Sequence, residues 1–384
     1  MSSPDLTELE RQAVLDVLNT PVLSMGTQIK KFEQAFIDLT GAKHAIGVNS
    51  GTAGLHLCVR AAGISAGDLV ITTPFSFVAS SNALLFENAV PVFVDVDART
   101  GNIDPELVAQ AAKDITANTN QAEKWLPRKG ATPGAKLKAL LPVDVFGQPA
   151  DMDKINATAR DYHLPVIEDS CEALGAIYKS RPAGMLGDYG IFAFYPNKQI
   201  TTGEGGVIIT SDDKAADLMR ALSNQGRAPG DTWLSHTHLG YNYRLDEMSA
   251  ALGVVQMSRL DELLSKREQV AEWYGDRLSE IPGVEVPIVE GYTTRMSWFV
   301  YVIRVDKKID RDRLAKRLES RGVPVRPYFL PIHLQPYMVE RFSWREGNFP
   351  VTEDLGRRGL AVPFSGVMTE EQVETVCSVI REEI

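Results

Sequence analysis

Cysteine is scarce in this sequence of 384 residues, which contains only Cys58, Cys171 and Cys377. Three widely separated cysteines supply neither a disulfide framework nor a Cys-x-x-Cys pair for a metal or redox site. Such sparing use of cysteine is typical of proteins that work in a reducing compartment. We therefore expect a cytoplasmic protein.

Long apolar runs and excess positive charge are also missing. No apolar run approaches the roughly 18 residues that a membrane-spanning helix needs, and the opening residues lack the basic and apolar stretches of a signal peptide. The 50 Asp and Glu residues outnumber the 40 Lys and Arg residues, which gives a net charge of −10. Because nucleic acids and anionic membranes attract clustered positive charge, we expect neither as a partner.

Several chemical motifs are absent or stand in the wrong context. Gly63-Ile-Ser-Ala-Gly67 matches the hydrolase pattern G-x-S-x-G, but it follows a predicted helix and precedes a predicted strand, the reverse of the required order. His236 and His238 offer two metal ligands, yet no nearby Cys or carboxylate pattern completes a site. The glycine motifs of Walker and dinucleotide-binding loops do not occur. We expect no metal.

The first two thirds of the chain alternate short apolar runs with helical patterns. This alternation implies right-handed crossovers and a mostly parallel sheet that is covered on both faces. The predicted strands are 44–48, 69–72, 90–94, 139–143, 165–167, 190–194 and 207–210, and the predicted helices are 6–18, 52–62, 78–85 and 104–113.

The pattern changes near residue 247, where apolar residues at helical spacing predict one long helix over 247–278. Beyond it the sequence predicts a strand (298–305), a helix (311–321), a strand (323–328) and a closing helix from residue 369. We therefore expect a large α/β domain over residues 1–255 and a small C-terminal α+β domain over residues 256–384. The polar stretch 114–137 has no clear pattern.

Two reactive side chains follow predicted strands. Asp169 ends the run Leu164-Pro-Val-Ile-Glu-Asp169, at the strand end where open α/β sheets bind ligands. Lys198 follows an aromatic strand and precedes a glycine-rich turn, where partial desolvation lowers an amine's pKa and favours nucleophilic chemistry. The alternatives are that Asp169 caps a helix and that Lys198 is a surface lysine.

A third element is the turn Asn49-Ser50-Gly51-Thr52 between a strand and a helix. Its backbone N–H groups, small glycine and hydroxyls at a positive helix end suit a phosphate, although a simple Ser/Thr helix cap has the same pattern. Phosphate turn, carboxylate and lysine together meet the needs of pyridoxal 5′-phosphate (PLP): a phosphate anchor, a partner for the pyridinium nitrogen and an amine for the Schiff base.

Five segments in order resemble the DegT/DnrJ/StrS family of PLP-dependent nucleotide-sugar aminotransferases. They are Asn49-Ser-Gly-Thr-Ala-Gly-Leu-His-Leu, Val143-Asp-Val-Phe-Gly-Gln-Pro-Ala-Asp-Met152, Ile167-Glu-Asp-Ser-Cys-Glu-Ala-Leu-Gly-Ala176, Phe194-Tyr-Pro-Asn-Lys-Gln-Ile-Thr-Thr-Gly-Glu-Gly-Gly206 and Leu239-Gly-Tyr-Asn-Tyr-Arg-Leu-Asp-Glu-Met-Ser-Ala-Ala-Leu-Gly253. The resemblance spans nearly the whole chain. It implies the PLP-dependent transferase fold of the aspartate aminotransferase type (fold type I), with a mostly parallel central sheet and a small C-terminal α+β domain.

The resemblance also implies roles for single residues. Lys198 forms the Schiff base with the cofactor, and Asp169 pairs with the pyridinium nitrogen. Ser50, Gly51 and Thr52 match the phosphate-binding turn. We also assign Glu172, in the motif of Asp169, to cofactor binding.

Two further positions come from the same resemblance. Phe77 matches an aromatic residue that stacks on the cofactor ring, with a core aromatic as the alternative. Asn242 matches a residue that is donated across a dimer interface to the same phosphate, so a homodimer with shared active sites is implied. One departure is Ala193, which stands where many members carry a serine that contacts the phosphate.

The implied reaction is a ping-pong transamination from L-glutamate to a nucleotide-linked keto sugar. The segment 201–206 resembles enzymes that aminate C4 rather than C3. Arg244, Arg326 and His333 are candidate cations for the substrate's diphosphate, with surface salt bridges and packing as the alternatives. A PLP-dependent deoxysugar dehydratase and a non-catalytic regulatory protein are alternative functions; relatives that dehydrate replace the lysine by histidine, which Lys198 opposes. The pathway, such as lipopolysaccharide or polysaccharide biosynthesis, stays open.

Overall fold

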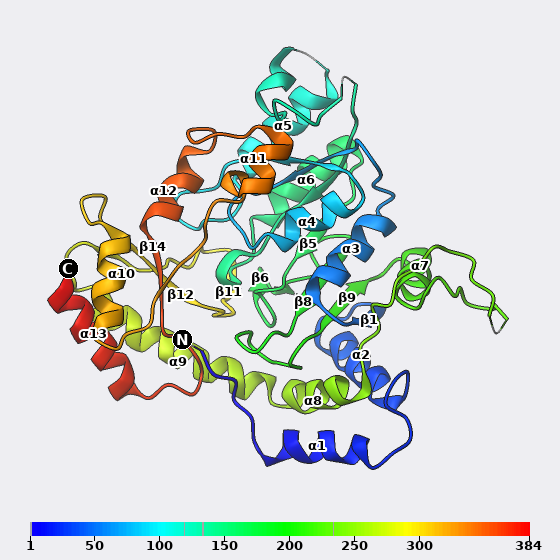
Figure 1. The fold of residues 1–384 in the computed structure, drawn as a ribbon, viewed down its shortest axis with the longest axis horizontal. Coiled ribbons are helices and arrows are strands. Elements are labelled where there is room, and N and C mark those ends of the chain that lie inside the picture. The colour runs from blue at the N-terminus through cyan, green and yellow to red at the C-terminus, as the bar shows by residue number, and fades with distance from the viewer. Residues whose placement is uncertain (1, 119, 133, 233) are drawn as a thin grey trace.

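The computed structural model describes residues 2–118, 120–132, 134–232 and 234–384, and its architecture is built around one twisted central sheet (Figure 1). The strands are β1 (His44–Val48), β9 (Gly206–Thr210), β8 (Tyr189–Ala193) and β5 (Ile167–Asp169) on one side, and β4 (Leu137–Leu141), β2 (Leu69–Thr72) and β3 (Val90–Phe93) on the other. Single bridges from Leu140 to Val166 and from Val143 to Asp169 join β4 to β5. The sheet order is therefore β1-β9-β8-β5-β4-β2-β3.

Strand directions confirm the prediction of a mostly parallel sheet. The pairs β8 with β5, β4 with β2 and β2 with β3 are parallel, whereas β9 is antiparallel to both of its neighbours. Parallel neighbours require crossover connections, which the intervening helices supply. The carboxyl ends of β1, β5 and β8 consequently lie at the same edge of the sheet.

Helices cover both faces of this sheet, because apolar side chains project from each strand to both sides. Val70 and Ile208 face a core formed with α3 (Gly51–Ala61), α4 (Ala79–Phe86) and α7 (Asp213–Ser223). Their chain neighbours face the opposite side. There Leu69 packs with α5 (Pro105–Thr116) and α6 (Met152–Tyr162), and Ile209 packs with α2 (Thr27–Thr40) and α8 (Glu247–Ser258).

The predicted helix 247–278 is wrong in one respect, because the structure divides it. Helix α8 ends at Ser258, and α9 (Leu260–Leu278) begins after the single intervening residue Arg259. At the break, the Arg259 guanidinium pairs with Asp5 and Glu10 beside α1 (Glu8–Leu18). These partners lie about 250 positions earlier in the chain, so no local pattern reveals the break.

The C-terminal part forms an antiparallel sheet in the order β10 (Val284–Glu285), β12 (Tyr301–Val305), β14 (Gly359–Val362) and β13 (Arg326–Pro327). Helices α9, α10 (Arg311–Ser320) and α13 (Glu370–Glu383) pack into its core. Strands β12 and β13 are shorter than the predicted 298–305 and 323–328. The boundary near residue 255 stays a prediction.

Several elements escape the sequence patterns, among them α2, α6, α7 and β14. The remaining elements are β6 (Ile177–Tyr178), β7 (Arg181–Pro182), β11 (Thr293–Arg295), α11 (Pro336–Phe342), α12 (Pro350–Arg358) and three short 3-10 turns, Asn120–Lys124, Val145–Gly147 and Ile332–Leu334. Within the polar stretch 114–137, only the end of α5, the first of these turns and the start of β4 are regular among the described residues. None of the helices in the described ranges combines the length and apolar character needed to cross a bilayer.

Candidate active site

A cavity of about 490 Å³ lies where the carboxyl ends of β5 and β8 meet the start of α3. Its wall includes the predicted residues Ser50, Gly51, Thr52, Phe77, Asp169, Glu172 and Lys198. Phe299 and Tyr328 close it from the C-terminal part of the chain. Residues as far apart in the sequence as Ser50 and Tyr328 thus converge on one space.

Asp169 is 4% exposed and sits at the end of β5. Its Oδ2 accepts a 2.7 Å hydrogen bond from Ser80 Oγ on α4, and its Oδ1 accepts one from the Cys171 backbone N–H. Ser76 Oγ lies 3.0 Å from Ser80 Oγ and extends this network. No helix follows Asp169, so the helix-cap alternative does not hold.

Lys198 is held inside the cavity wall, with its side chain 13% exposed, so it is not a surface lysine. Its Nζ lies 3.7 Å from Glu172 Oε1 and 3.8 Å from the centroid of the Phe299 ring. Glu172 Oε2 accepts a 2.9 Å hydrogen bond from the Phe146 backbone N–H. Burial raises the pKa of Glu172 even though the Lys198 charge acts in the opposite direction.

The start of α3 faces the same cavity. Ser50 is the N-cap, and its Oγ accepts a hydrogen bond from the Ala53 N–H. The Ser50 hydroxyl therefore caps the helix, as the alternative interpretation of this turn stated. Gly51 is the first helical residue. A Cβ on it would lie 2.7 Å from Ala193 Cβ and 3.0 Å from Cys171 Sγ. The helix N-terminus can therefore approach the end of β8 only with glycine at position 51.

Phe77 is 63% exposed and lines the cavity, which excludes the alternative of a core aromatic. Asn242 lies outside the wall of this chain's cavity and is exposed. Its backbone carbonyl accepts a hydrogen bond from Asn49 Nδ2, and the Tyr243 carbonyl accepts one from the Asn49 N–H. The Asn242 segment is thus attached to the turn that opens α3.

The three candidate substrate cations do not line the cavity of their own chain. Arg244 borders a separate open hollow and donates to Asn224 Oδ1 at 3.0 Å. Arg326 is exposed and pairs with Glu319 at 2.6 Å. His333 is 0% exposed, its Nε2 lies 3.0 Å from Glu353 Oε1, and burial lowers its pKa. Arg326 thus forms the surface salt bridge that was its alternative interpretation. His333 is packed in the interior, as its own alternative stated.

Several wall residues were not found from the sequence. Tyr195 and Asn197 flank the lysine turn, and the buried Oδ1 of Asn197 has no hydrogen-bond partner among the described residues. Phe299 and Tyr328 reach the cavity from the C-terminal part, for which no local signal exists. Ser80 had one signal, because it stands four residues after Ser76. Its hydrogen bond to Asp169 nevertheless depends on the fold.

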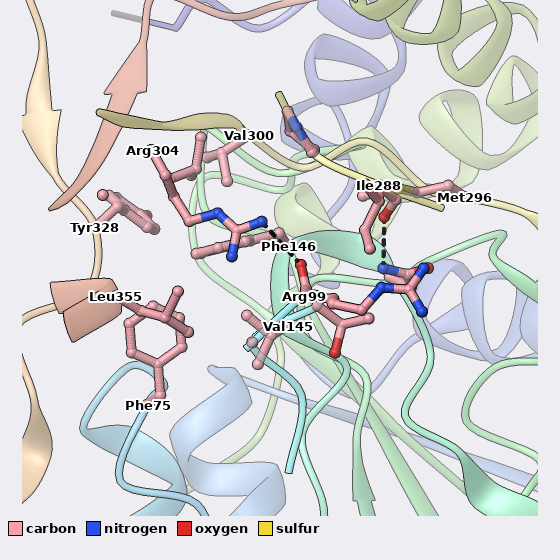
Figure 2. A pocket seen from close by; sticks show the side chains of 16 residues that line it. Phe75, Arg99, Val145, Phe146, Ile288, Met296, Val300, Arg304, Tyr328 and Leu355 are labelled. Atoms are coloured by element: carbon pink, nitrogen blue, oxygen red, sulfur yellow. Dashed lines mark hydrogen bonds between the residues drawn. The ribbon is translucent and has the colours of Figure 1, made fainter. Parts of the chain in front are cut away.

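A second, smaller hollow shares Tyr328 with the main cavity. Figure 2 shows it between Phe75, Phe146 and Leu355, with Arg304 reaching the backbone carbonyl of Arg99. Its volume is about 40 Å³, against about 490 Å³ for the main cavity, and its wall combines residues of the N-terminal and C-terminal parts of the chain.

Comparison with known proteins agrees with this geometry. Residues 4–381 match the DegT/DnrJ/EryC1/StrS aminotransferase family. The GDP-perosamine synthase of Caulobacter vibrioides is 36% identical over 383 residues, covering 99% of this chain and 96% of that protein. S. venezuelae DesV is 31% identical with a TM-score of 0.86, covering 97% of this chain and 93% of its own. E. coli GDP-4-keto-6-deoxy-D-mannose-3-dehydratase with bound hydrated PLP is 25% identical with a TM-score of 0.86, covering 99% and 98%.

The sheet, with a lysine and a carboxylate at one edge, defines a PLP-dependent aminotransferase of fold type I. More specifically, the chain belongs to the DegT/DnrJ/EryC1/StrS aminotransferase family. The prediction from the five segments is thereby confirmed for family, fold class and cofactor.

The cavity residues fit PLP on three counts. The N-terminus of α3 presents backbone N–H groups where Gly51 permits close approach, which suits a phosphate. The Asp169 carboxylate is fixed by Ser80 and faces the cavity. The Lys198 amine lies in the same wall, and no donor within the described ranges reaches the buried Asn197 Oδ1.

Proposed function

We propose that this enzyme moves an amino group from L-glutamate to C4 of a nucleotide-linked keto-deoxysugar. The observation that carries the proposal is the convergence of the Lys198 amine, the Asp169 carboxylate and the α3 N-terminus on one cavity. A volume of about 490 Å³ is in the usual range for small-molecule sites. Similarity to GDP-perosamine synthases supports a nucleotide-linked sugar as the acceptor.

Each wall residue has a defined task in this proposal. PLP, when bound, supplies an electron-withdrawing ring that stabilises negative charge on the carbon bearing the migrating nitrogen. Asp169 would keep a proton on the ring nitrogen of the bound cofactor, and Ser80 keeps the carboxylate in place through its 2.7 Å hydrogen bond. Gly51 and Thr52 at the start of α3 would hold the phosphate, and Phe77 would contact the ring.

With the cofactor bound, Lys198 would anchor it between turnovers, and the released amine would carry the proton during amino transfer. Glu172, 3.7 Å from the amine, can share its proton. Because burial raises the pKa of Glu172, its carboxyl can hold a proton at a pH where an exposed glutamate is ionised. This is the arrangement that general acid–base catalysis needs.

We further propose a homodimer in which Asn242 reaches the phosphate of the partner's site. Large apolar side chains lie exposed along the N-terminal segment 6–25, namely Leu6, Leu9, Leu15, Leu18, Val22, Leu23 and Met25. Extended apolar patches of this kind mark protein interfaces. The exposed position of Asn242, outside its own cavity, is consistent with a role across that interface. The free Cys58, Cys171 and Cys377 support a cytoplasmic location.

The position of the new amine is tested by product analysis. Purified enzyme is incubated with a nucleotide-linked 4-keto-6-deoxysugar and [15N]-L-glutamate, and the product is examined by NMR. We expect nitrogen on C4 and one 2-oxoglutarate per amino sugar. Nitrogen on C3 would overturn the C4 assignment. A product that has lost a sugar hydroxyl and carries no 15N, with the nitrogen released as ammonia, would favour the dehydratase reaction, which the similarity to the E. coli dehydratase makes the second candidate.

A further inference from the structure

The buried guanidinium of Arg267 occupies an unusual position behind the lysine turn. Arg267 belongs to α9 and is 4% exposed. Its Nη2 donates to the carbonyls of Lys198 (2.6 Å) and Asn197 (3.3 Å), and its Nη1 donates to those of Trp298 and Phe299 (3.2 Å each). One nitrogen therefore serves the lysine turn, and the other serves the segment that carries the Phe299 ring.

This cation has no charged partner to compensate its burial. Among the described residues no carboxylate lies within ion-pair distance of it, and burial alone lowers the pKa of the Arg267 guanidinium to about 10. Its charge is met by backbone carbonyls and by the face of Phe364, whose ring centroid lies 5.7 Å from Cζ. Burying an unpaired cation costs stability, so an apolar residue would suit a purely structural role better.

The two segments joined by Arg267 set the surroundings of the Lys198 amine. Phe299 places its ring 3.8 Å from Nζ, and the Phe299 N–H bonds to the carbonyl of Phe146. The Phe146 N–H in turn holds Glu172, whose Oε1 lies 3.7 Å from Nζ. A shift between the lysine turn and the Phe299 segment would therefore move the amine relative to both neighbours.

A neighbouring contact holds the same segments at other points. Gln199 Nε2 donates to the carbonyls of Ser297 and Glu172. The residue after Lys198 and the residue two before Phe299 are thus connected without Arg267. The contacts of Gln199 do not include the carbonyls of Lys198 and Phe299, which accept hydrogen bonds from Arg267.

We propose that Arg267 is a positioning residue that fixes the Lys198 amine against Phe299 and Glu172. Its planar guanidinium does so by donating hydrogen bonds to both backbone segments at once. The inference rests on the proposed role of Lys198. Arginine is required because its planar donors reach both segments at once, whereas a lysine at this position has a single nitrogen. Displacements of about 1 Å at a reacting group cost up to about 100-fold in rate.

The test compares Arg267→Lys and Arg267→Met with Arg311→Lys in the cofactor-loaded enzyme. Arg311 serves as the control because it is also buried and donates to a backbone carbonyl, that of Gly359, while it lines no part of the cavity; unlike Arg267 it also pairs with a carboxylate, that of Asp312 at 2.7 Å. We expect Arg267→Lys to lower kcat by about 10- to 100-fold with the KM for glutamate within about twofold. The circular dichroism of the bound cofactor changes in both Arg267 variants and stays that of the wild type in Arg311→Lys.

Hydrogen exchange supplies a readout that does not depend on activity. In Arg267→Lys, amide exchange should rise in peptides covering both 194–202 and 296–302, and Arg311→Lys should leave both unchanged. If Arg267→Met does not fold, Arg267→Lys decides the matter alone, because it keeps a cation and part of the carbonyl contacts. Wild-type kcat and dichroism in Arg267→Lys, with or without faster exchange, would overturn the inference.

Failure of the proposed function is recognised separately. Lys198→Ala is measured in the same series. If this variant keeps the visible absorbance of the bound cofactor and its turnover, the role of Lys198 is wrong whatever Arg267 does. If it loses both and Arg267→Lys behaves as the wild type, only the inference about Arg267 fails.

Discussion

Replacing Gly51 by alanine tests the contact between the α3 N-terminus and the end of β8. The added Cβ would lie 2.7 Å from Ala193 Cβ and 3.0 Å from Cys171 Sγ. Ala193 has no rotatable side chain and Gly51 is buried, so the backbone of α3 must move away. Overpacking of this kind costs about 1–3 kcal/mol.

The cost should appear in cofactor affinity, because the displaced N–H groups are those proposed to bind phosphate. If all of it falls on binding, Kd for PLP rises about 5- to 150-fold. Titration of the apoprotein with PLP, followed by visible absorbance, measures this change. The double variant Gly51→Ala with Ala193→Gly removes the closest contact and should recover a large part of the affinity.

Two results would refute the reasoning about Gly51. Wild-type affinity in Gly51→Ala would show that α3 does not approach the cofactor closely. Equal loss in the single and the double variant would show that the Ala193 contact is not the cause. Thermal unfolding of both variants separates loss of binding from loss of folding.

Two other predictions follow from single contacts. Ser80→Ala removes the 2.7 Å hydrogen bond to Asp169. Because hydrogen bonds to charged groups contribute about 1.5–3 kcal/mol, kcat should fall about tenfold or more, while the unfolding temperature stays near that of the wild type. An unchanged kcat would exclude a role for this bond. Burial lowers the pKa of His333, so the unfolded chain binds its proton first, and stability should decline as the pH falls below about 6.5. Unfolding temperatures at pH 7.5 and 5.5 should differ less in His333→Gln than in the wild type; equal differences would contradict this assignment.

The strands of the central sheet could be predicted from the sequence because they are short apolar runs. Both faces of the sheet are buried, so consecutive residues of a strand are apolar. Val70 and Leu69 show the rule, since adjacent residues face different cores. The predicted helix 247–278 is divided at Arg259, whose guanidinium pairs with the distant Asp5. Nothing near Arg259 in the chain indicates that contact.

The site was predictable where its residues follow strands. Asp169 and Lys198 stand in local patterns, and the fold brings both to one cavity. Phe299 could not be predicted, because its place beneath the lysine depends on the packing of the C-terminal part. Charge in a loop was a poor guide: His333 Nε2 pairs with the Glu353 carboxylate, and the residue lies outside the cavity.

The central claim is that Lys198 and Asp169 form a glutamate-dependent PLP site, and a visible absorbance titration tests it most directly. Purified enzyme loaded with PLP should lose the band of the lysine-bound cofactor on addition of L-glutamate and release one 2-oxoglutarate per site. Lys198→Ala should show neither the band nor the release. A wild-type band that glutamate leaves unchanged, or an unaltered response in Lys198→Ala, would contradict the account.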